Sequence, residues 1–243
     1  MINFSFHITH YTFFIFTREK IQQSNPRGYT MAKIPAVLIF GAPGSGKGTV
    51  GAKLAATTSL KHISTGDIFR GIAPSSESGK LLASYSSKGL LVPDEATVEI
   101  FGRFIEGLIN TNKVNPDKDT LLLDGIPRTV AQVKLIESVV DVKHIFVLDI
   151  KDEKTIVARL LNRAKIEGRK DDADEAVIKN RLKVYKESTA KVLGKYSKSI
   201  ISRINGDNTP DEVFCDTLAA YVKFCKASAK KPAAKKTAKA KKK

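Results

Sequence analysis

A glycine-rich loop that carries one lysine is the first set of residues able to do chemistry. Residues 41–49 read GAPGSGKGT and follow an apolar run. The glycines let successive backbone N–H groups turn toward one anion, at the positive end of a helix that begins near Gly46. Lys47 adds a charge suited to nucleotide phosphates. The loop predicts a phosphate site, although Gly48 stands where Ser or Thr is usual and Thr49 comes one residue later.

Arginines and carboxylates recur in four further segments. Arg159 and Arg163 are four residues apart, and therefore on one helical face, while Arg169 and Arg181 follow in the next stretch. The planar guanidinium binds phosphate oxygens two at a time, so an arginine cluster favours phosphate chemistry. Any one of these arginines alone would be an ordinary surface residue. The segments are STGDIFR (64–70), LLLDGIPRT (121–129), ARLLNRAKIEGRKDD (158–172) and NGDNTPDEV (205–213).

An alternation of apolar runs and amphipathic stretches must position these segments. Nearly continuous apolar runs are typical of strands covered on both faces, and alternation with helices predicts a doubly wound α/β fold with a parallel sheet. The stretches 64–93 and 164–174 interrupt the alternation and are expected to be mounted on the core. The predicted strands are 35–40, 120–124, 144–150 and 200–204, and the predicted helices are 46–58, 94–110, 129–140, 152–163, 175–195 and 210–225.

The net charge of +16 is concentrated at the C-terminal end. Residues 226–243 hold nine lysines and no acidic residue, and we expect a disordered, Lys-rich tail. Salt-sensitive contact with nucleic acid or another polyanion is the alternative for this segment. Residues 1–30 contain an aromatic patch too short to span a membrane. We expect this extension to be dispensable and Met31 to be the working start.

GAPGSGKGT resembles the loop of nucleoside-monophosphate kinases, and of adenylate kinases in particular. The other four segments match that family in order and spacing over about residues 34–222. The resemblance implies a P-loop NTPase-like, five-stranded parallel sheet in a kinase domain at 31–225. Residues 64–93 would bind the monophosphate, and 164–174 would form a short lid. It also implies reversible transfer of the ATP γ-phosphoryl group to AMP, with Mg²⁺ bound to ATP, in a cytoplasmic monomer without membrane contact.

The resemblance assigns a role to each matching residue. Asp124 would contact Mg²⁺ through water, with Thr49 as a second candidate, and Asp171 and Asp172 would hold the lid arginines. The expected catalytic residues are Lys47, Arg128, Arg163, Arg169 and Arg181. The expected ATP contacts are Gly44, Ser45, Gly46, Lys47, Gly48, Thr49, Arg159, Arg163 and Asn208. The expected AMP contacts are Thr65, Arg70, Leu90, Leu91, Val92, Gly125, Ile126, Pro127, Arg128, Gln132, Arg169 and Arg181.

Two departures and two rival interpretations accompany this assignment. Ile126 replaces the family's usual aromatic, and Lys191 stands where proline is usual. A lid of about ten residues leaves no room for a four-cysteine zinc site, so no zinc is expected. Cys215 and Cys225 lack metal-ligand spacing and indicate free thiols in a reducing compartment. The rivals are a UMP/CMP kinase with the same fold and a P-loop protein whose basic tail binds nucleic acid.

Overall fold

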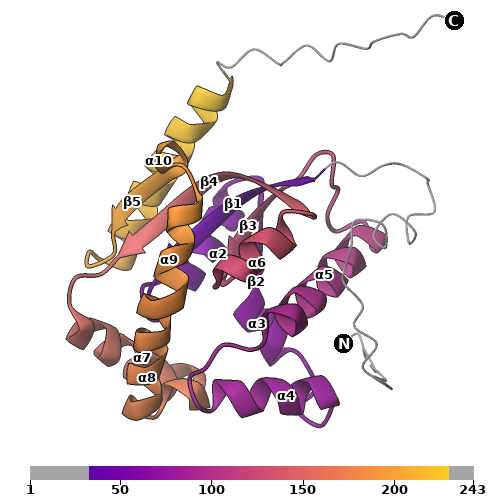
Figure 1. Cartoon of the computed structure of the whole chain (residues 1–243). Helices are drawn as coiled ribbons and strands as arrows, with labels where there is room; N and C mark the ends of the chain where they lie inside the picture. The colour runs from indigo at the N-terminus through magenta and orange to yellow at the C-terminus, as the bar shows by residue number, and fades with distance from the viewer. Residues whose placement is uncertain (1–32, 230–243) are drawn as a thin grey trace, which may run out of the picture.

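The computed structural model describes residues 33–229. Within this range the chain forms one sheet of five parallel strands in the order β2-β3-β1-β4-β5. The predicted doubly wound parallel sheet is therefore confirmed (Figure 1). The strands are β1 (Ile34–Gly41), β2 (Leu60–Ser64), β3 (Thr120–Asp124), β4 (Val140–Asp149) and β5 (Ile201–Asn205).

Helices connect the strands and cover both faces of the sheet (Figure 1). A 3-10 turn (Lys170–Asp172) lies between α7 and α8, and a π-turn (Tyr185–Thr189) joins α8 to α9. Two more 3-10 turns, at Leu193–Lys195 and Lys198–Ile200, lead into β5. The helices are α2 (Lys47–Thr57), α3 (Thr65–Arg70), α4 (Glu77–Ser86), α5 (Asp94–Asn110), α6 (Val130–Ile136), α7 (Glu153–Glu167), α8 (Glu175–Val184), α9 (Ala190–Val192) and α10 (Pro210–Ala229).

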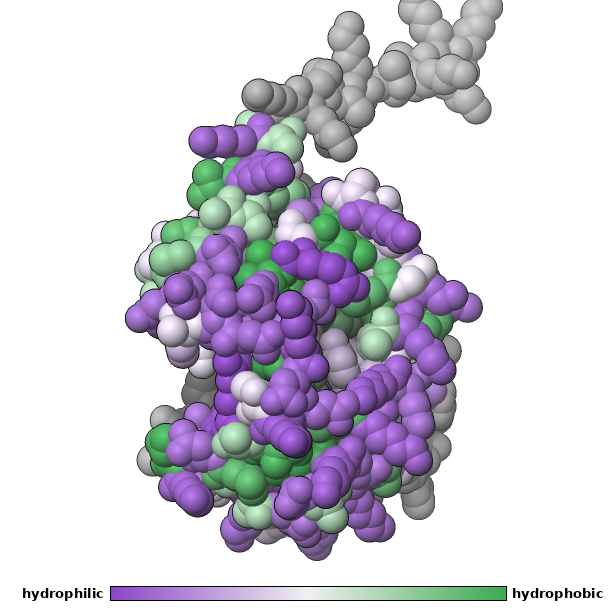
Figure 2. Space-filling model, turned by 90° about the vertical axis from the view of Figure 1, so that its left-hand side faces the viewer, coloured by the Kyte–Doolittle hydropathy of each residue, from purple (hydrophilic) through white to green (hydrophobic). Residues whose placement is uncertain are grey.

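Three hydrophobic clusters hold this arrangement together. Alternate residues of the central strands point to opposite faces, where α5, α6 and α9 cover one side and α2 and α10 the other. The smaller third cluster joins α7 to α8 through Ile156, Leu160, Ile178 and Leu182. Ala42 and Ile150, which follow β1 and β4, pack against this cluster, so it holds the α7–α8 pair beside the glycine-rich loop. Hydrophilic residues cover most of the face in Figure 2, with hydrophobic ones in its lower part and along α10 at the top.

The structure adds one strand to the prediction and changes the ends of several predicted helices. β2 was not predicted as a strand, because its five residues include only two buried apolar ones. The helix predicted at 129–140 ends at Ile136. Val140 already starts β4, because it pairs with Ile34 of β1. The helix predicted at 175–195 is interrupted by the π-turn and ends in a 3-10 turn. The helix predicted at 210–225 continues to Ala229 as α10, so it includes the first four residues of the tail expected at 226–243. The predictions for residues 1–30 and 230–243 lie outside the described residues.

Candidate active site

The glycine-rich loop leaves the centre of the sheet and enters α2. Gly46 precedes the helix with a φ of 90°, in the left-handed region that glycine adopts readily. No side chain caps the first turn of α2, which leaves its N–H groups available to an anion. Lys47 Nζ donates hydrogen bonds of 2.9 Å to the carbonyl oxygens of Gly41 and Ala42. The loop thus has the local geometry of a phosphate site.

Lys47 lies among charged side chains that come from several elements. Burial lowers the pKa of the Lys47 ammonium to about 8; Asp124 opposes this shift, and Arg128, Arg181 and Arg163 add to it. Asp124 ends β3, Arg128 lies in the turn between β3 and α6, and Arg163 and Arg181 lie on α7 and α8. Folding therefore gathers three arginines and one carboxylate near Lys47, an arrangement that favours an anionic ligand.

We expect ATP affinity to fall as the pH rises above 8. ATP favours the charged form of Lys47, so its pKa is higher in the complex than the value of about 8 in the free protein. Binding above that value takes up a proton and weakens by at most about tenfold per pH unit. Calorimetry in buffers of different ionisation enthalpy measures this uptake. Lys47→Arg should abolish it, whereas Lys53→Arg, on the same helix, should retain it; uptake that persists in Lys47→Arg would contradict the assignment.

The lid side of the site is organised around one buried carboxylate. Asp172 has no solvent exposure and pairs with both Arg163, at 2.6 Å, and Arg181. Arg181 also donates to Asp171 at 2.9 Å. The sequence-based expectation needs one correction here: Arg169 pairs with Glu167, at 2.5 Å, rather than with Asp171 or Asp172. The reason is local: Glu167 is the last residue of α7, and only Gly168, with a left-handed backbone, separates it from Arg169.

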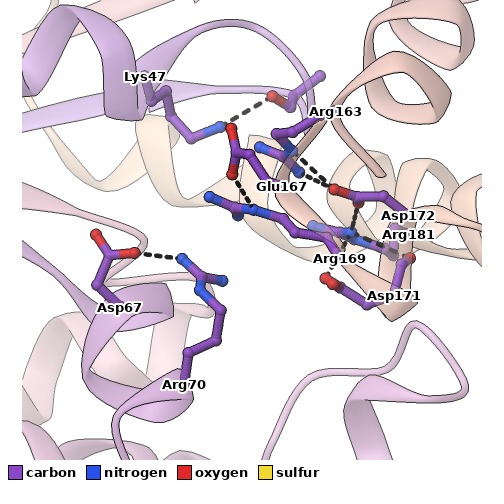
Figure 3. A network of polar contacts seen from close by, with 10 residues as sticks. Lys47, Asp67, Arg70, Arg163, Glu167, Arg169, Asp171, Asp172 and Arg181 are labelled. Atoms are coloured by element: carbon purple, nitrogen blue, oxygen red, sulfur yellow. Dashed lines mark hydrogen bonds and ion pairs between the residues drawn. The ribbon is translucent and has the colours of Figure 1, made fainter. Parts of the chain in front are cut away.

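Figure 3 shows that these lid arginines face the loop lysine and Arg70 across a common space. Arg70, at the end of α3, pairs with Asp67 in the same helix. Asp67 is close enough to Arg169 for that arginine to favour its charged form. The structure therefore places Arg70, from the segment expected to bind AMP, around the same space as Lys47 and the lid arginines.

Arg128 follows the carboxyl end of β3. Asp124 ends this strand and is level with Ile39 of β1 and Ser64 of β2. Arg128 Nε donates to the carbonyl oxygen of Gly125 at 2.8 Å, which aims the guanidinium back at the strand end. Burial lowers the pKa of Arg128, as does the nearby Arg181, but an arginine stays protonated throughout the ordinary pH range.

Gly125 has a conformation and surroundings that exclude a side chain. Its φ is 85°, and a Cβ there would lie 2.4 Å from Thr65 Oγ1 and 2.9 Å from Arg128 Nη2. The space beside this glycine, expected to admit the base, is thus shared with a hydroxyl and a guanidinium. Thr65 is itself buried, with 1% exposure, and donates to the carbonyl oxygen of Asp124 at 3.3 Å.

Replacement of Gly125 by alanine should weaken both folding and AMP binding. The left-handed backbone and the two close contacts together should cost about 1–3 kcal/mol of unfolding free energy. Chemical denaturation and AMP titration measure the two effects. Gly194→Ala is the matched control, since nothing lies within 4 Å of the Cβ it adds. Equal stability of the two variants would refute the packing argument.

The remaining residues expected near AMP differ in exposure. Leu90 is 43% exposed and Leu91 is partly exposed, whereas Val92 is buried beneath them. Ile126 and Pro127 are buried and joined by a cis peptide bond. Gln132 is 1% exposed and forms hydrogen bonds with both ends of its side-chain amide. The apolar members can line a site, and only Gln132 among them offers directional contacts.

The segment expected to meet the ATP base lies beside α7. Arg159 donates to the carbonyl oxygens of Gly206, at 2.9 Å, and Asp207, at 3.4 Å. Asn208 accepts a hydrogen bond from Asn205 across the same turn. Arg159 is therefore tied to the turn before α10 and lies apart from the Asp172 cluster, although it shares a helical face with Arg163. This geometry suits a base-side position more than a phosphate contact.

Asp124 and the loop form the position where a metal ion could lie. A Cβ on Gly48 would be 3.9 Å from Asp124 Oδ2, so these two positions face each other. Thr49 is exposed on the first turn of α2. In residues 33–229, no group of three or more His, Cys, Asp or Glu side chains could hold a metal ion. One carboxylate beside a phosphate loop fits Mg²⁺, which keeps several waters and is held largely by nucleotide phosphates.

Two residues near the site were missed at the level of sequence. His62 of β2 lies with Nε2 at 3.9 Å from Asp124 Oδ2, and that nitrogen is buried without a hydrogen-bond partner. Asp94, the first residue of α5, accepts a hydrogen bond from Gln132. A β2 prediction would have placed His62 at the sheet edge. The contact of Asp94 spans 38 residues and has no local signal.

Comparison with known proteins identifies the family to which this arrangement belongs. The family model described as adenylate kinase matches residues 39–201, which include the loop, β3 and the lid arginines. The chain belongs to the adenylate kinase family. The adenylate kinase of Porphyromonas gingivalis is 36% identical over 199 residues, which cover 79% of this chain and 98% of that protein.

Other adenylate kinases show a similar relationship over the same part of the chain. The adenylate kinase of Kocuria rhizophila is 38% identical over 190 residues, covering 76% of this chain and 97% of the relative. That of Thermus thermophilus is 33% identical over 192 residues, covering 76% and 96%. The suspected family and the enzyme class of nucleotide phosphotransferases are thus confirmed. No helix in the described part of the chain is long and apolar enough to cross a membrane.

Proposed function

We propose that this protein transfers the γ-phosphoryl group of Mg²⁺-bound ATP reversibly to AMP and yields two ADP molecules. The observation that carries the proposal is that Arg128, Arg163, Arg181 and the carboxylate of Asp124 all lie close enough to Lys47 to act on its charge. ATP and AMP carry four phosphates between them, and these anions suit the cations gathered here. The adenylate kinase family supports the same substrates.

The reaction needs charge neutralisation more than covalent help. An AMP phosphate oxygen forms the new P–O bond while the bond between the γ-phosphorus and the bridging oxygen breaks, and ADP keeps the electron pair. The acceptor is already an oxyanion, so no general base is required. Repulsion between the two anions opposes transfer, and the fixed guanidinium and ammonium groups reduce it most where charge spreads over the γ-phosphoryl oxygens.

Each cation has a proposed position in this reaction. Lys47 and the N–H groups of residues 44–49 hold the β- and γ-phosphates of ATP, while Arg70 and Arg128 hold the AMP phosphate. Arg163, Arg169 and Arg181 approach the transferring group from the lid side. Residues 64–93 and 164–174 then act as the AMP-binding part and the lid, whose closure excludes water. Asp124 would hold Mg²⁺ through water, with Thr49 as a second candidate, and the ion would supply charge neutralisation of the ATP phosphates.

A coupled assay of ATP with AMP, UMP or CMP tests this proposal. We expect AMP to be the fastest acceptor and transfer to require Mg²⁺. Faster turnover of UMP or CMP would instead assign the protein to pyrimidine nucleotides. No transfer to any acceptor, with ATP still bound, would leave the loop as a binding site without kinase activity.

We also propose a reducing cytoplasmic location and a monomeric state. Both cysteines, Cys215 and Cys225, are free and exposed on α10, as thiols in a reducing compartment can be. Fractionation of native cells and light scattering of the purified protein test these two points. Recovery of the protein outside the cytoplasm, or a mass from light scattering equal to that of a dimer, would overturn them.

Residues 226–243 are proposed to add a separate, salt-sensitive contact with polyanions. Nine lysines without an acidic residue support this proposal, because release of condensed counterions drives such binding. Deletion of these residues should abolish retention on DNA at low salt and leave phosphoryl transfer to AMP unchanged. The full chain at high salt is the control. Equal retention of both proteins at low salt would refute the contact.

A further inference from the structure

The side-chain amide of Gln132 is held at its oxygen end by the backbone. Gln132 is the third residue of α6, and its own N–H donates to Thr129 Oγ1, which caps the helix at 3.1 Å. Its side chain turns back so that Oε1 accepts the N–H of Arg128 at 2.6 Å. This is a variant of the reciprocal cap found at helix starts. The backbone N–H can only donate, so an oxygen must face it.

A carboxylate holds the nitrogen end of the same amide. Gln132 Nε2 donates to Asp94 Oδ1 at 2.8 Å, from the first turn of α5. An ionised carboxylate can only accept hydrogen bonds. A flipped amide would therefore set Nε2 against the Arg128 N–H and Oε1 against the Asp94 carboxylate. Since Gln132 is only 1% exposed, water cannot readily relieve these two repulsive contacts.

The locked amide retains one hydrogen on Nε2 and one acceptor position on Oε1. Adenine offers the complementary order, with an exocyclic amino group that donates and a ring N1 that accepts. A 6-oxopurine reverses both, because O6 accepts and N1–H donates. A reversed base that keeps the same ribose and phosphate contacts would need the amide flipped. The free-energy cost of that flip lowers the affinity for a 6-oxopurine monophosphate relative to a 6-aminopurine monophosphate.

We propose that Asp94 is a positioning residue that fixes the orientation of Gln132 and so makes the acceptor site selective for 6-aminopurine over 6-oxopurine monophosphates. This inference rests on the proposed function, because it assumes that AMP binds against Gln132. Asp94 itself touches no substrate in this scheme. Its effect on the base passes entirely through the amide, and the Arg128 backbone supplies the second constraint.

Asp94→Asn tests the inference, because an asparagine side chain can turn to accept or to donate. It therefore removes the repulsion that a flipped Gln132 amide meets at position 94, while the constraint from the Arg128 N–H remains. We would measure kcat/KM for AMP and for IMP with ATP as donor. The ratio of the two should fall by at least about tenfold relative to the unmodified protein. Asp94→Ser, whose hydroxyl also accepts and donates, is the second variant if the asparagine variant folds poorly.

Glu95→Gln is the matched control. It removes one carboxylate from the same first turn of α5, where negative charge stabilises a helix, but Glu95 is exposed. It should leave the AMP-to-IMP ratio unchanged. Equal losses for AMP and IMP in Asp94→Asn, or an unchanged ratio, would overturn the inference and reduce Asp94 to a structural residue. Absence of AMP phosphorylation by the unmodified protein would instead refute the proposed function.

Discussion

Arg128→Ala should lower kcat/KM for AMP by roughly 10²–10³ and leave the protein folded, as expected for the loss of one well-aligned donor to developing charge. Arg128 is partly buried just after β3, and its Nε–H donates to the Gly125 carbonyl oxygen, which aims the guanidinium toward the space shared with Lys47 and Arg181. A guanidinium fork that is already directed loses little entropy when it binds phosphate.

Steady-state kinetics and thermal unfolding together measure this result. Arg128→Lys separates charge from geometry: it keeps the positive charge and loses the planar fork, so most of the activity should still be lost. Arg203→Ala is the control, because Arg203 pairs with Asp149 at 2.8 Å on the surface and is 62% exposed. Near-normal turnover of Arg128→Ala would contradict the assignment of Arg128 to phosphate binding.

Asp172→Ala should reduce both stability and activity, since this residue holds two lid arginines at once. Arg163 and Arg181 are 28% and 21% exposed, while Asp172 is fully buried between them. Its removal leaves two like charges in a poorly hydrated place. A loss of about 3 kcal/mol is expected, at the lower end of the range for a broken buried pair because the arginines remain partly hydrated. This corresponds to a decrease of about 6–12 °C in Tm.

The activity of Asp172→Ala should fall by roughly 10² or more, because Arg163 and Arg181 lose the contact that orients both. Unfolding experiments and kinetics below the new Tm distinguish the two effects. Asp171→Asn is the matched control: Asp171 is 30% exposed, and within residues 33–229 its carboxylate pairs with Arg181 alone, so a change within about 1 kcal/mol is expected. Full activity of folded Asp172→Ala would show that the lid arginines are oriented by other contacts.

Local patterns were sufficient for the phosphate loop and for most of the sheet. The apolar runs that became β1, β3 and β4 are nearly continuous because parallel strands are covered on both faces. The apolar pattern did not predict β2. In the described sheet this strand lies at the edge, beside β3, and it is therefore less completely covered and less apolar. The π-turn at 185–189 was not predicted either, because its residues have ordinary helical character.

Sequence alone therefore determined the parts whose causes are local: the glycines and lysine of the loop, and the arginines of α7 and α8. Tertiary structure decided which of them meet. Asp172 pairs with Arg163 and Arg181 only because the α7–α8 cluster folds the lid turn between the two helices. Asp94 reaches Gln132 only because α5 packs beside α6. Such contacts depend on the packing of distant elements, and no spacing along the chain encodes them.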